Sequence, residues 1–252
     1  MLTGLLAVVM IGLIPRAPIP LHYRVELKSA RRIDRSSSDT AGGDFTAVAF
    51  MSATLRDTAG GRIGRVVIDS VTCSGTGLLS MAYDPVVGQR SAGAWYDVML
   101  LTARPEQLPR PSIRNPLTEA LAQVALQLFP PVHRRSAAGD AWIDTLDIRT
   151  ATDRWSESRP AVTRWRVVSN DGAEEAIEGD VTVIVAVSGQ VSGTGMIIGK
   201  RRMAITRDGA VRAATLSTTE QMLAAAANAN DIRTLRGLTS ASITLLSAAP
   251  RP

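Results

Sequence analysis

The sequence predicts a mainly β fold, built from antiparallel, meander-like sheets in two similar halves that one central helix, at about residues 115–128, joins. Three observations support this prediction: segments in which apolar and polar residues alternate, turn signals between those segments, and a single amphipathic stretch near mid-chain. Alternation with a period of two is typical of a strand with one buried face. Many such strands separated by tight turns indicate antiparallel sheets.

The first alternating segment is residues 23–28, where Tyr23, Val25 and Leu27 are separated by charged residues. Similar segments recur at 45–55, 62–71, 78–83, 95–103, 142–148, 164–169, 181–187, 203–207 and 241–246. Turn signals such as Gly42-Gly43-Asp44 and Asn170-Asp171-Gly172 lie between them, because Gly, Asn and Asp tolerate turn conformations. The strands are therefore expected on both sides of the helix.

The central helix has a clear beginning and end. Asn115 is a good N-cap, Pro116 suits the first helical position, and Phe129-Pro130-Pro131 ends the helix. An apolar stripe lies between them, formed by Leu117, Leu121, Val124 and Leu128. The Ala-rich run at 218–230 has two open interpretations: a second helix by propensity, or part of a hairpin that turns at 228–231.

Four segments organise the chain. Residues 1–20 form a hydrophobic N-terminal anchor or signal with a Pro-rich exit, and 21–114 form a first β module that ends in a Pro-rich connector. Residues 115–138 hold the helix and a Phe-Pro linker, and 139–252 form a second β module. Ser74-Gly75-Thr76-Gly77 recurs as Ser192-Gly193-Thr194-Gly195, so a duplication is one interpretation of the two halves, and it stays open.

The N-terminal segment predicts membrane attachment or export. Residues 1–14 are apolar, no basic residue precedes Arg16, and no Ala-x-Ala cleavage site follows, so cleavage stays an open question. As a helix this segment measures roughly 21 Å, less than the ~30 Å of a bilayer core. The residues expected to attach the chain to a membrane are Leu2, Leu5, Leu6, Val8, Val9, Met10, Ile11, Leu13 and Ile14.

Composition narrows the functional classes. Apolar residues make up 45% of the chain and aromatic residues 4%, so the expected core is aliphatic. One cysteine excludes an internal disulfide framework. The net charge of +5 comes mostly from scattered Arg, since Lys occurs only at 28 and 200. No basic-aromatic stripe accompanies this charge, and we therefore expect no nucleic-acid partner.

One stretch resembles a known group of proteins. Phe129-Pro130, followed by Gly139-Asp140-Ala141-Trp142-Ile143-Asp144-Thr145, resembles a Phe-Pro … Gly-Asp-x-Trp-x-Asp-Thr element of exported bacterial β-rich proteins of uncharacterised function. The resemblance extends loosely over residues 21–247 and is specific at 129–145. It implies an envelope location and a strand-rich fold, and it implies no activity.

Catalytic chemistry is not expected. The only histidines, His22 and His133, lie in neighbourhoods that do not suit a nucleophile's base. Cys73 is interpreted as a small buried residue. The acidic run Glu174, Glu175, Glu178 and Asp180 is interpreted as a solvated loop, not as a metal site. The predicted protein is therefore not an enzyme and has no cofactor and no metal.

The sequence predicts a structural or adaptor subunit of the cell envelope. It would be anchored by its N-terminus, or secreted, on the periplasmic side of the cytoplasmic membrane and bound to a larger integral membrane complex, such as a respiratory or photosynthetic assembly. The expected partner contacts are Arg104, Arg110, Arg134 and Arg135. The alternative is a periplasmic carrier whose curved sheet binds a lipid or lipoprotein acyl chain in an apolar concavity.

Overall fold

The computed structural model describes residues 20–35, 40–58, 61–101, 104–105, 110–129, 137–151, 155–226 and 232–248. The strands are β1 Leu21–Arg35, β2 Thr40–Thr58, β3 Gly61–Gly75, β4 Trp95–Leu101, β5 Arg104–Pro105, β6 Ala141–Ala151, β7 Trp155–Asn170, β8 Glu174–Gly189, β9 Val191–Thr206, β10 Val211–Ala226 and β11 Ile232–Ala248. The helices are α1 Pro85–Ser91 and α2 Pro116–Ala125, with short 3-10 turns η1 Gly77–Leu79 and η2 Leu126–Leu128. The mainly β prediction is confirmed.

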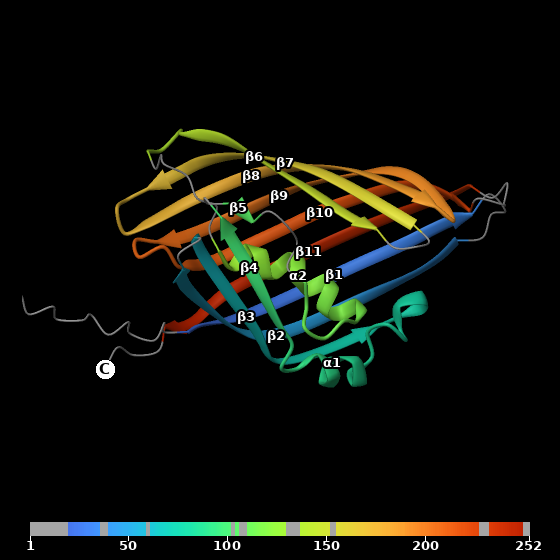
Figure 1. Ribbon diagram of the computed structural model, residues 1–252, viewed down its shortest axis with the longest axis horizontal. Helices are drawn as coiled ribbons and strands as arrows, with labels where there is room; N and C mark the ends of the chain where they lie inside the picture. Colours follow the sequence, from blue (N-terminus) through green and yellow to red (C-terminus); the bar gives the residue numbers. More distant parts are fainter. Residues whose placement is uncertain are drawn as a thin grey trace, which may run out of the picture.

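All strands belong to one antiparallel sheet with the order β5-β4-β3-β2-β1-β11-β10-β9-β8-β7-β6. Figure 1 shows this sheet curving around α2. The first strand lies inside the sheet, where β1 pairs with β11 on one side and β2 on the other. The described structure does not confirm two sheets joined by a central helix, because the β1–β11 pairing connects the two halves directly.

The central helix begins where the sequence predicts. The side chain of Asn115 accepts a hydrogen bond from the Thr118 backbone amide at 2.9 Å, and the Thr118 hydroxyl accepts one from the Asn115 amide at 3.0 Å. This capping box satisfies two amides that a helix start leaves without partners. The phenol of Tyr96 on β4 donates to the Thr118 carbonyl at 2.8 Å, buried, and so fixes the helix start against the sheet.

The core lies between α2 and the sheet. Tyr23, Val25 and Leu27 on β1 are 0%, 0% and 2% exposed, which confirms the predicted alternation. One continuous core cluster includes Leu117 and Leu121 of α2, residues of β1–β4, and residues of β7–β11 such as Trp165. Both halves of the chain therefore share a single hydrophobic core.

The undecided segment 218–230 is a strand as far as it is described. Thr218 pairs with Thr239 of β11 and with Gly199 of β9, so two neighbours supply the ladder hydrogen bonds that outweigh the helix propensity of the alanines. A Cβ built at Gly195 on β9 would lie 2.5 Å from the Gln221 carbonyl oxygen of β10. Glycine therefore permits these two strands to approach closely at this point. Residues 227–231 lie outside the described part.

Two elements differ from the predictions. Residues 78–83, predicted as a strand, instead lie across η1 and the turn that follows it. Helix α1 was not predicted, although Asp84 is its N-cap and accepts from the Val87 amide at 2.7 Å. The predicted connector at 104–114 begins with the short strand β5, which pairs with β4.

Candidate functional site

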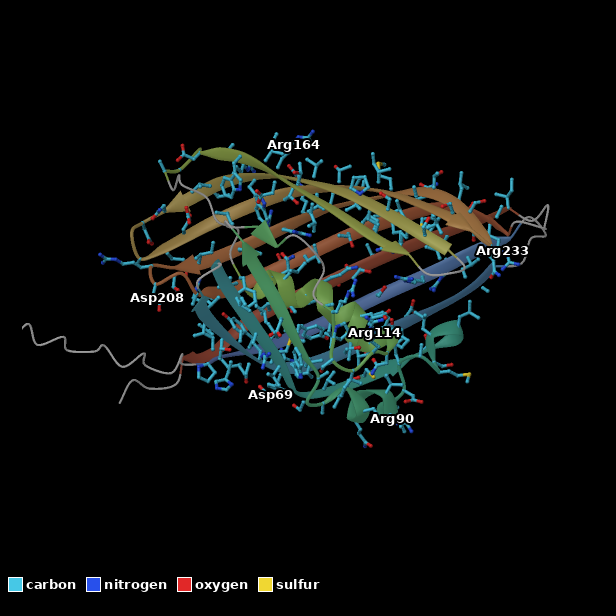
Figure 2. The ribbon with its side chains drawn as sticks, in the orientation of Figure 1. Asp69, Arg90, Arg114, Arg164, Asp208 and Arg233 are labelled. Atoms are coloured by element: carbon cyan, nitrogen blue, oxygen red, sulfur yellow. The ribbon has the colours of Figure 1, made fainter. Side chains whose placement is uncertain are left out.

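The two faces of the sheet differ in chemistry. We call the face that packs against α2 the inner face and the opposite one the outer face. On β9, Met203 faces inward and is 4% exposed, whereas its neighbour Arg202 is exposed on the outer face and bonds Glu178 at 2.8 Å. Figure 2 shows the labelled side chains of Arg164 and Asp69 on opposite outer sides of the molecule. The outer face also carries exposed apolar side chains, among them Ile184, Ile198 and Leu238, so what distinguishes the inner face is that its apolar side chains adjoin the buried core.

A row of polar side chains crosses the inner face beside the core. We call it the polar row, and it consists of Ser29, Thr239, Thr218, Thr163 and Asp144. Ser29 and Thr239 bond through their hydroxyls at 3.0 Å. Gly199 lies between Thr218 and Val181 in the register, and the methyl group of Thr218 covers it, since a Cβ built at Gly199 would lie 2.6 Å from the Thr218 Cγ2.

Arg201 lies next to this row on the inner face. Its register partners are Gly179 on β8 and Leu216 on β10, both buried. The Nε atom of Arg201 is buried and has no hydrogen-bond partner. Burial lowers the pKa of Arg201 to about 10, against an opposing effect of the Asp144 charge, since burial disfavours a charged form and a nearby carboxylate favours it.

The carboxylate near Arg201 is positioned by an aromatic pair. Trp142 of β6 and Trp165 of β7 stack with ring centroids 6.1 Å apart. The indole Nε1 of Trp142 donates to the Asp144 carboxylate at 3.4 Å. The Gly-Asp-x-Trp-x-Asp-Thr stretch thus brings Trp142 and Asp144 to the inner face beside Arg201.

Beyond the polar row, the inner face carries aliphatic side chains. We call Leu146, Ala161, Val183 and Ile197 the aliphatic row, and adjacent strands pair them in this order. All four are half-buried, as are Met222 and Leu235 one pair further along β10 and β11. These side chains are separated from the packed core by the polar row, and they remain partly uncovered. The aliphatic row ends at β10, where Ile197 pairs with Glu220, whose carboxylate lies 3.9 Å from the Arg31 guanidinium.

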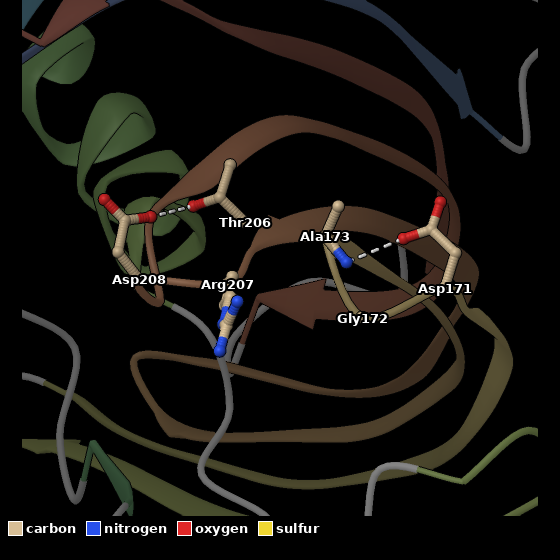
Figure 3. A pocket seen from close by; sticks show the side chains of 6 residues that line it. All are labelled: Asp171, Gly172, Ala173, Thr206, Arg207 and Asp208. Atoms are coloured by element: carbon tan, nitrogen blue, oxygen red, sulfur yellow. Dashed lines mark hydrogen bonds between the residues drawn. The ribbon is translucent and has the colours of Figure 1, made fainter.

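The two hollows shown by the structure lie elsewhere. The first, of about 890 Å³, lies between the β7–β8 and β9–β10 turns (Figure 3). Its Asp171 carboxylate accepts from the Ala173 and Glu174 amides at 2.9 and 2.8 Å, and the Thr206 hydroxyl donates to Asp208. Its polar groups therefore stabilise the turns themselves.

The second hollow is a groove on the outer face, of about 460 Å³. Hydroxyls of β10 and β11 form its floor, and Lys28 and Lys200 line it together with Arg202 and Glu26. Glu26 is already paired with Arg24, and Arg202 with Glu178. The groove is a solvated charged surface whose small Ser and Thr side chains make it shallow.

The residues predicted for attachment and partner contact are not brought together. Residues 2–14 and Arg134 and Arg135 lie outside the described residues. Arg110 is exposed, and Arg104 is in the two-residue strand β5. No helix in the described part is long and apolar enough to cross a membrane.

The residues rejected for catalysis have structural partners. His22 on β1 shares a 3.1 Å hydrogen bond with the Ser52 hydroxyl, and His133 lies outside the described part. Cys73 is buried, its thiol donates to the Asp84 carbonyl at 3.1 Å, and burial raises its pKa. Within the described ranges, no group of three or more His, Cys, Asp or Glu residues is arranged to hold a metal.

Arg201 was missed by the sequence analysis. The predicted strand at 203–207 began too late, so Lys200, Arg201 and Arg202 had no assigned faces. Extending the alternation back from Met203 places Arg201 inward, between two exposed basic residues. A buried position for the middle residue of a basic triplet was the available signal.

Comparison with known proteins identifies no family, since neither a family model nor a curated protein matches the chain. Three solved structures that match are Neisserial surface protein A (6% identity; 89% of this chain and 97% of that one; TM-score 0.23), an outer membrane channel from Pseudomonas putida F1 (7%; 93% and 98%; 0.25), and the β domain of the Bordetella autotransporter BrkA (10%; 89% and 99%; 0.22).

These comparisons contradict two predictions. The matching proteins are described as a surface protein, an outer membrane channel and the β domain of an autotransporter, and not as adaptor subunits on the periplasmic side of the cytoplasmic membrane. The predicted adaptor function and the predicted location are therefore wrong, and the periplasmic carrier is not retained in that location. At these identities and TM-scores, the likeness assigns this chain neither a channel activity nor an outer-membrane location.

Proposed function

We propose that the chain is a non-enzymatic binding protein that holds the apolar part of an elongated ligand against the aliphatic row of its inner face. The observation that carries this proposal is the position of Leu146, Ala161, Val183 and Ile197. They lie on the same face as the core, yet they are only half-buried. A ligand that covers them removes apolar surface from water, which is favourable.

The free energy gained by burying an alkyl chain on the aliphatic row can support reversible binding. Burying one methylene group contributes roughly 0.8 kcal/mol, so an alkyl chain of about ten methylenes has about 8 kcal/mol available before ordering costs are subtracted. The gross value sets an upper limit of about micromolar affinity, and the ordering costs make the actual binding weaker. The aliphatic row crosses four adjacent strands, which lie about 4.8 Å apart, and therefore offers a contact that suits an extended chain better than a compact one.

The glycines of β9 determine which side chains border Ile197. Gly195 and Gly199 flank Ile197 on the inner face, and all three are half-buried. The space beside each glycine is filled from β10: a Cβ built at Gly195 would lie 2.4 Å from the Met222 Cγ, and one at Gly199 would lie 2.6 Å from the Thr218 Cγ2. Met222 and Thr218 therefore border Ile197 on the inner face, and an alkyl chain laid over Ile197 can also contact Met222 and the neighbouring Val183.

Two adjacent residues of β9 provide a matched test. Ile197 faces inward and is half-buried, whereas Ile198 faces outward and is 49% exposed. The probe is the methyl ester of cis-parinaric acid, a neutral fluorescent acyl compound. We expect saturable binding to the wild type, loss of binding in Ile197→Glu, and wild-type binding in Ile198→Glu. Circular dichroism checks that both variants are folded.

Two outcomes contradict the proposal. The first is a folded wild type that does not bind the ester. The second is an equal loss of binding in both variants, which would show that the probe adheres to apolar surface without preference for the inner face.

A further inference from the structure

Arg201 is a half-buried cation whose guanidinium has one buried atom without a hydrogen-bond partner. Its Nε atom is inaccessible to solvent and has no partner, while its register neighbours Gly179 and Leu216 supply no polar side chain. Burying a charged group is costly unless its hydrogen bonds are satisfied. An unsatisfied buried polar atom calls for an explanation, and an anion supplied from outside the chain is one that fits a guanidinium.

The surroundings of Arg201 fit a single negative charge. The carboxylate of Asp144 is close enough to favour the charged form of Arg201, and it also accepts from Trp142. Asp144 therefore neutralises part of the charge of Arg201, and one further monoanion can bind the guanidinium. A doubly charged phosphate would meet stronger repulsion from Asp144, since like charges at short range are unfavourable.

A hydroxyl donor is available beside the guanidinium. Thr218 is half-buried and lies diagonally from Arg201 on the inner face, because Leu216 pairs with Arg201 and Thr218 pairs with Gly199. Diagonal neighbours on one face of a sheet are within reach of long side chains. Gly199 adds no side chain between them. A carboxylate at this point has a guanidinium for one oxygen and a hydroxyl for the other.

We propose that Arg201, assisted by Thr218, binds the carboxylate of a fatty-acid-like ligand. This inference rests on the proposed function, because the aliphatic row holds the chain of the same ligand. The polar row lies between the core and the aliphatic row, so the head group sits at the inner end of the site and the alkyl chain extends outward over Ile197 and Val183. The ligand class is thus a long-chain monocarboxylate.

The experiment compares cis-parinaric acid with its methyl ester at about pH 8, where the free acid is ionised. Wild-type protein is expected to bind the acid about tenfold or more tightly than the ester, as is typical when a charged hydrogen bond is gained. Arg201→Met is expected to bind the two probes equally, and Arg201→Lys to keep part of the preference. Arg202→Met, on the outer face, is the matched control and should retain the wild-type preference.

The outcomes separate this inference from the proposed function. If the wild type binds acid and ester equally, the carboxylate inference falls while the proposed function stands. If it binds neither, both fall. Tighter binding of dodecyl phosphate than of laurate overturns the carboxylate as the head group. The wild-type preference needs no variant, so a failure of Arg201→Met to fold leaves the inference testable, with Thr218→Val as the second variant.

Discussion

The ring of Phe129 covers Gly64: a methyl group built at Gly64 would lie 2.4 Å from the Phe129 Cζ. Phe129 follows η2, and Gly64 lies on β3 between Leu55 of β2 and Val98 of β4. The ring therefore packs directly on strand backbone, which only a glycine at this position permits. This contact attaches the end of the α2–η2 segment to the sheet.

Replacing Gly64 with Ala is expected to destabilise the protein by about 1–3 kcal/mol, because the added methyl group forces a fully buried aromatic ring to move. Urea unfolding measures the change in the free energy of unfolding. In a Phe129→Leu background, Gly64→Ala should lower the free energy of unfolding by a smaller amount, because the ring atoms that clash with the added methyl group are absent. Equal costs in both backgrounds would show that Gly64 is required for another reason.

The capping box of α2 gives a second prediction. Asn115→Ala removes the acceptor for the Thr118 amide and is expected to lower the free energy of unfolding by about 1 kcal/mol. Gln123→Ala on the exposed side of α2 is the control and should change it by less than about 0.5 kcal/mol. The same urea titration measures both variants, and a cost at Gln123 as large as at Asn115 would refute the capping argument.

The strand pattern and the helix could be predicted because both depend on local periodicity. Tyr23, Val25 and Leu27 alternate with charged residues, and the Asn115 cap precedes an apolar stripe. The single sheet could not be predicted, because the pairing of β1 with β11 joins residues more than 200 positions apart. Residues 218–226 could not be decided between helix and strand for a related reason: hydrogen bonds to β9 and β11 determine their structure, and their helix propensity does not.

The candidate site was hidden by a missing strand boundary. Met203 was predicted as the first strand residue, although β9 begins at Val191, because glycines at 193, 195 and 199 interrupt the apolar alternation. The face of Arg201 follows only when the strand is extended through them. The aliphatic row could not be located from the sequence, since its half-burial depends on which strands α2 leaves uncovered.

The turn after β7 gives a prediction on pH. Backbone amides of Glu174 and Ala173 hold the pKa of Asp171 below its ordinary value. A carboxyl whose pKa is lowered by folding stabilises the native state above its unfolded pKa, and this contribution is lost as the pH falls through the folded pKa. The side chain at position 171 cannot titrate in Asp171→Asn. The free energy of unfolding of this variant should therefore fall less steeply than that of the wild type between about pH 5 and pH 2.

Urea unfolding of both proteins across this pH range measures the difference. Asp69→Asn on β3 is the control, because Asp69 is a comparably exposed carboxyl that lies outside this turn. If wild type and Asp171→Asn show parallel curves, the hydrogen bonds to Asp171 do not contribute to acid sensitivity.

Arg201 gives the last prediction, which concerns the protein without ligand. If its guanidinium serves to bind a ligand, it is a cost to the ligand-free fold, because its Nε is buried without a partner. Arg201→Met keeps an unbranched but shorter side chain and removes the charge together with the unpartnered Nε, so the free energy of unfolding should stay equal or rise by about 1 kcal/mol. Arg202→Met loses only the exposed pair with Glu178 and should change it by less than about 1 kcal/mol. A loss of about 3 kcal/mol or more in Arg201→Met would instead identify Arg201 as the structural partner of Asp144, since removing one member of a buried ion pair leaves the other uncompensated.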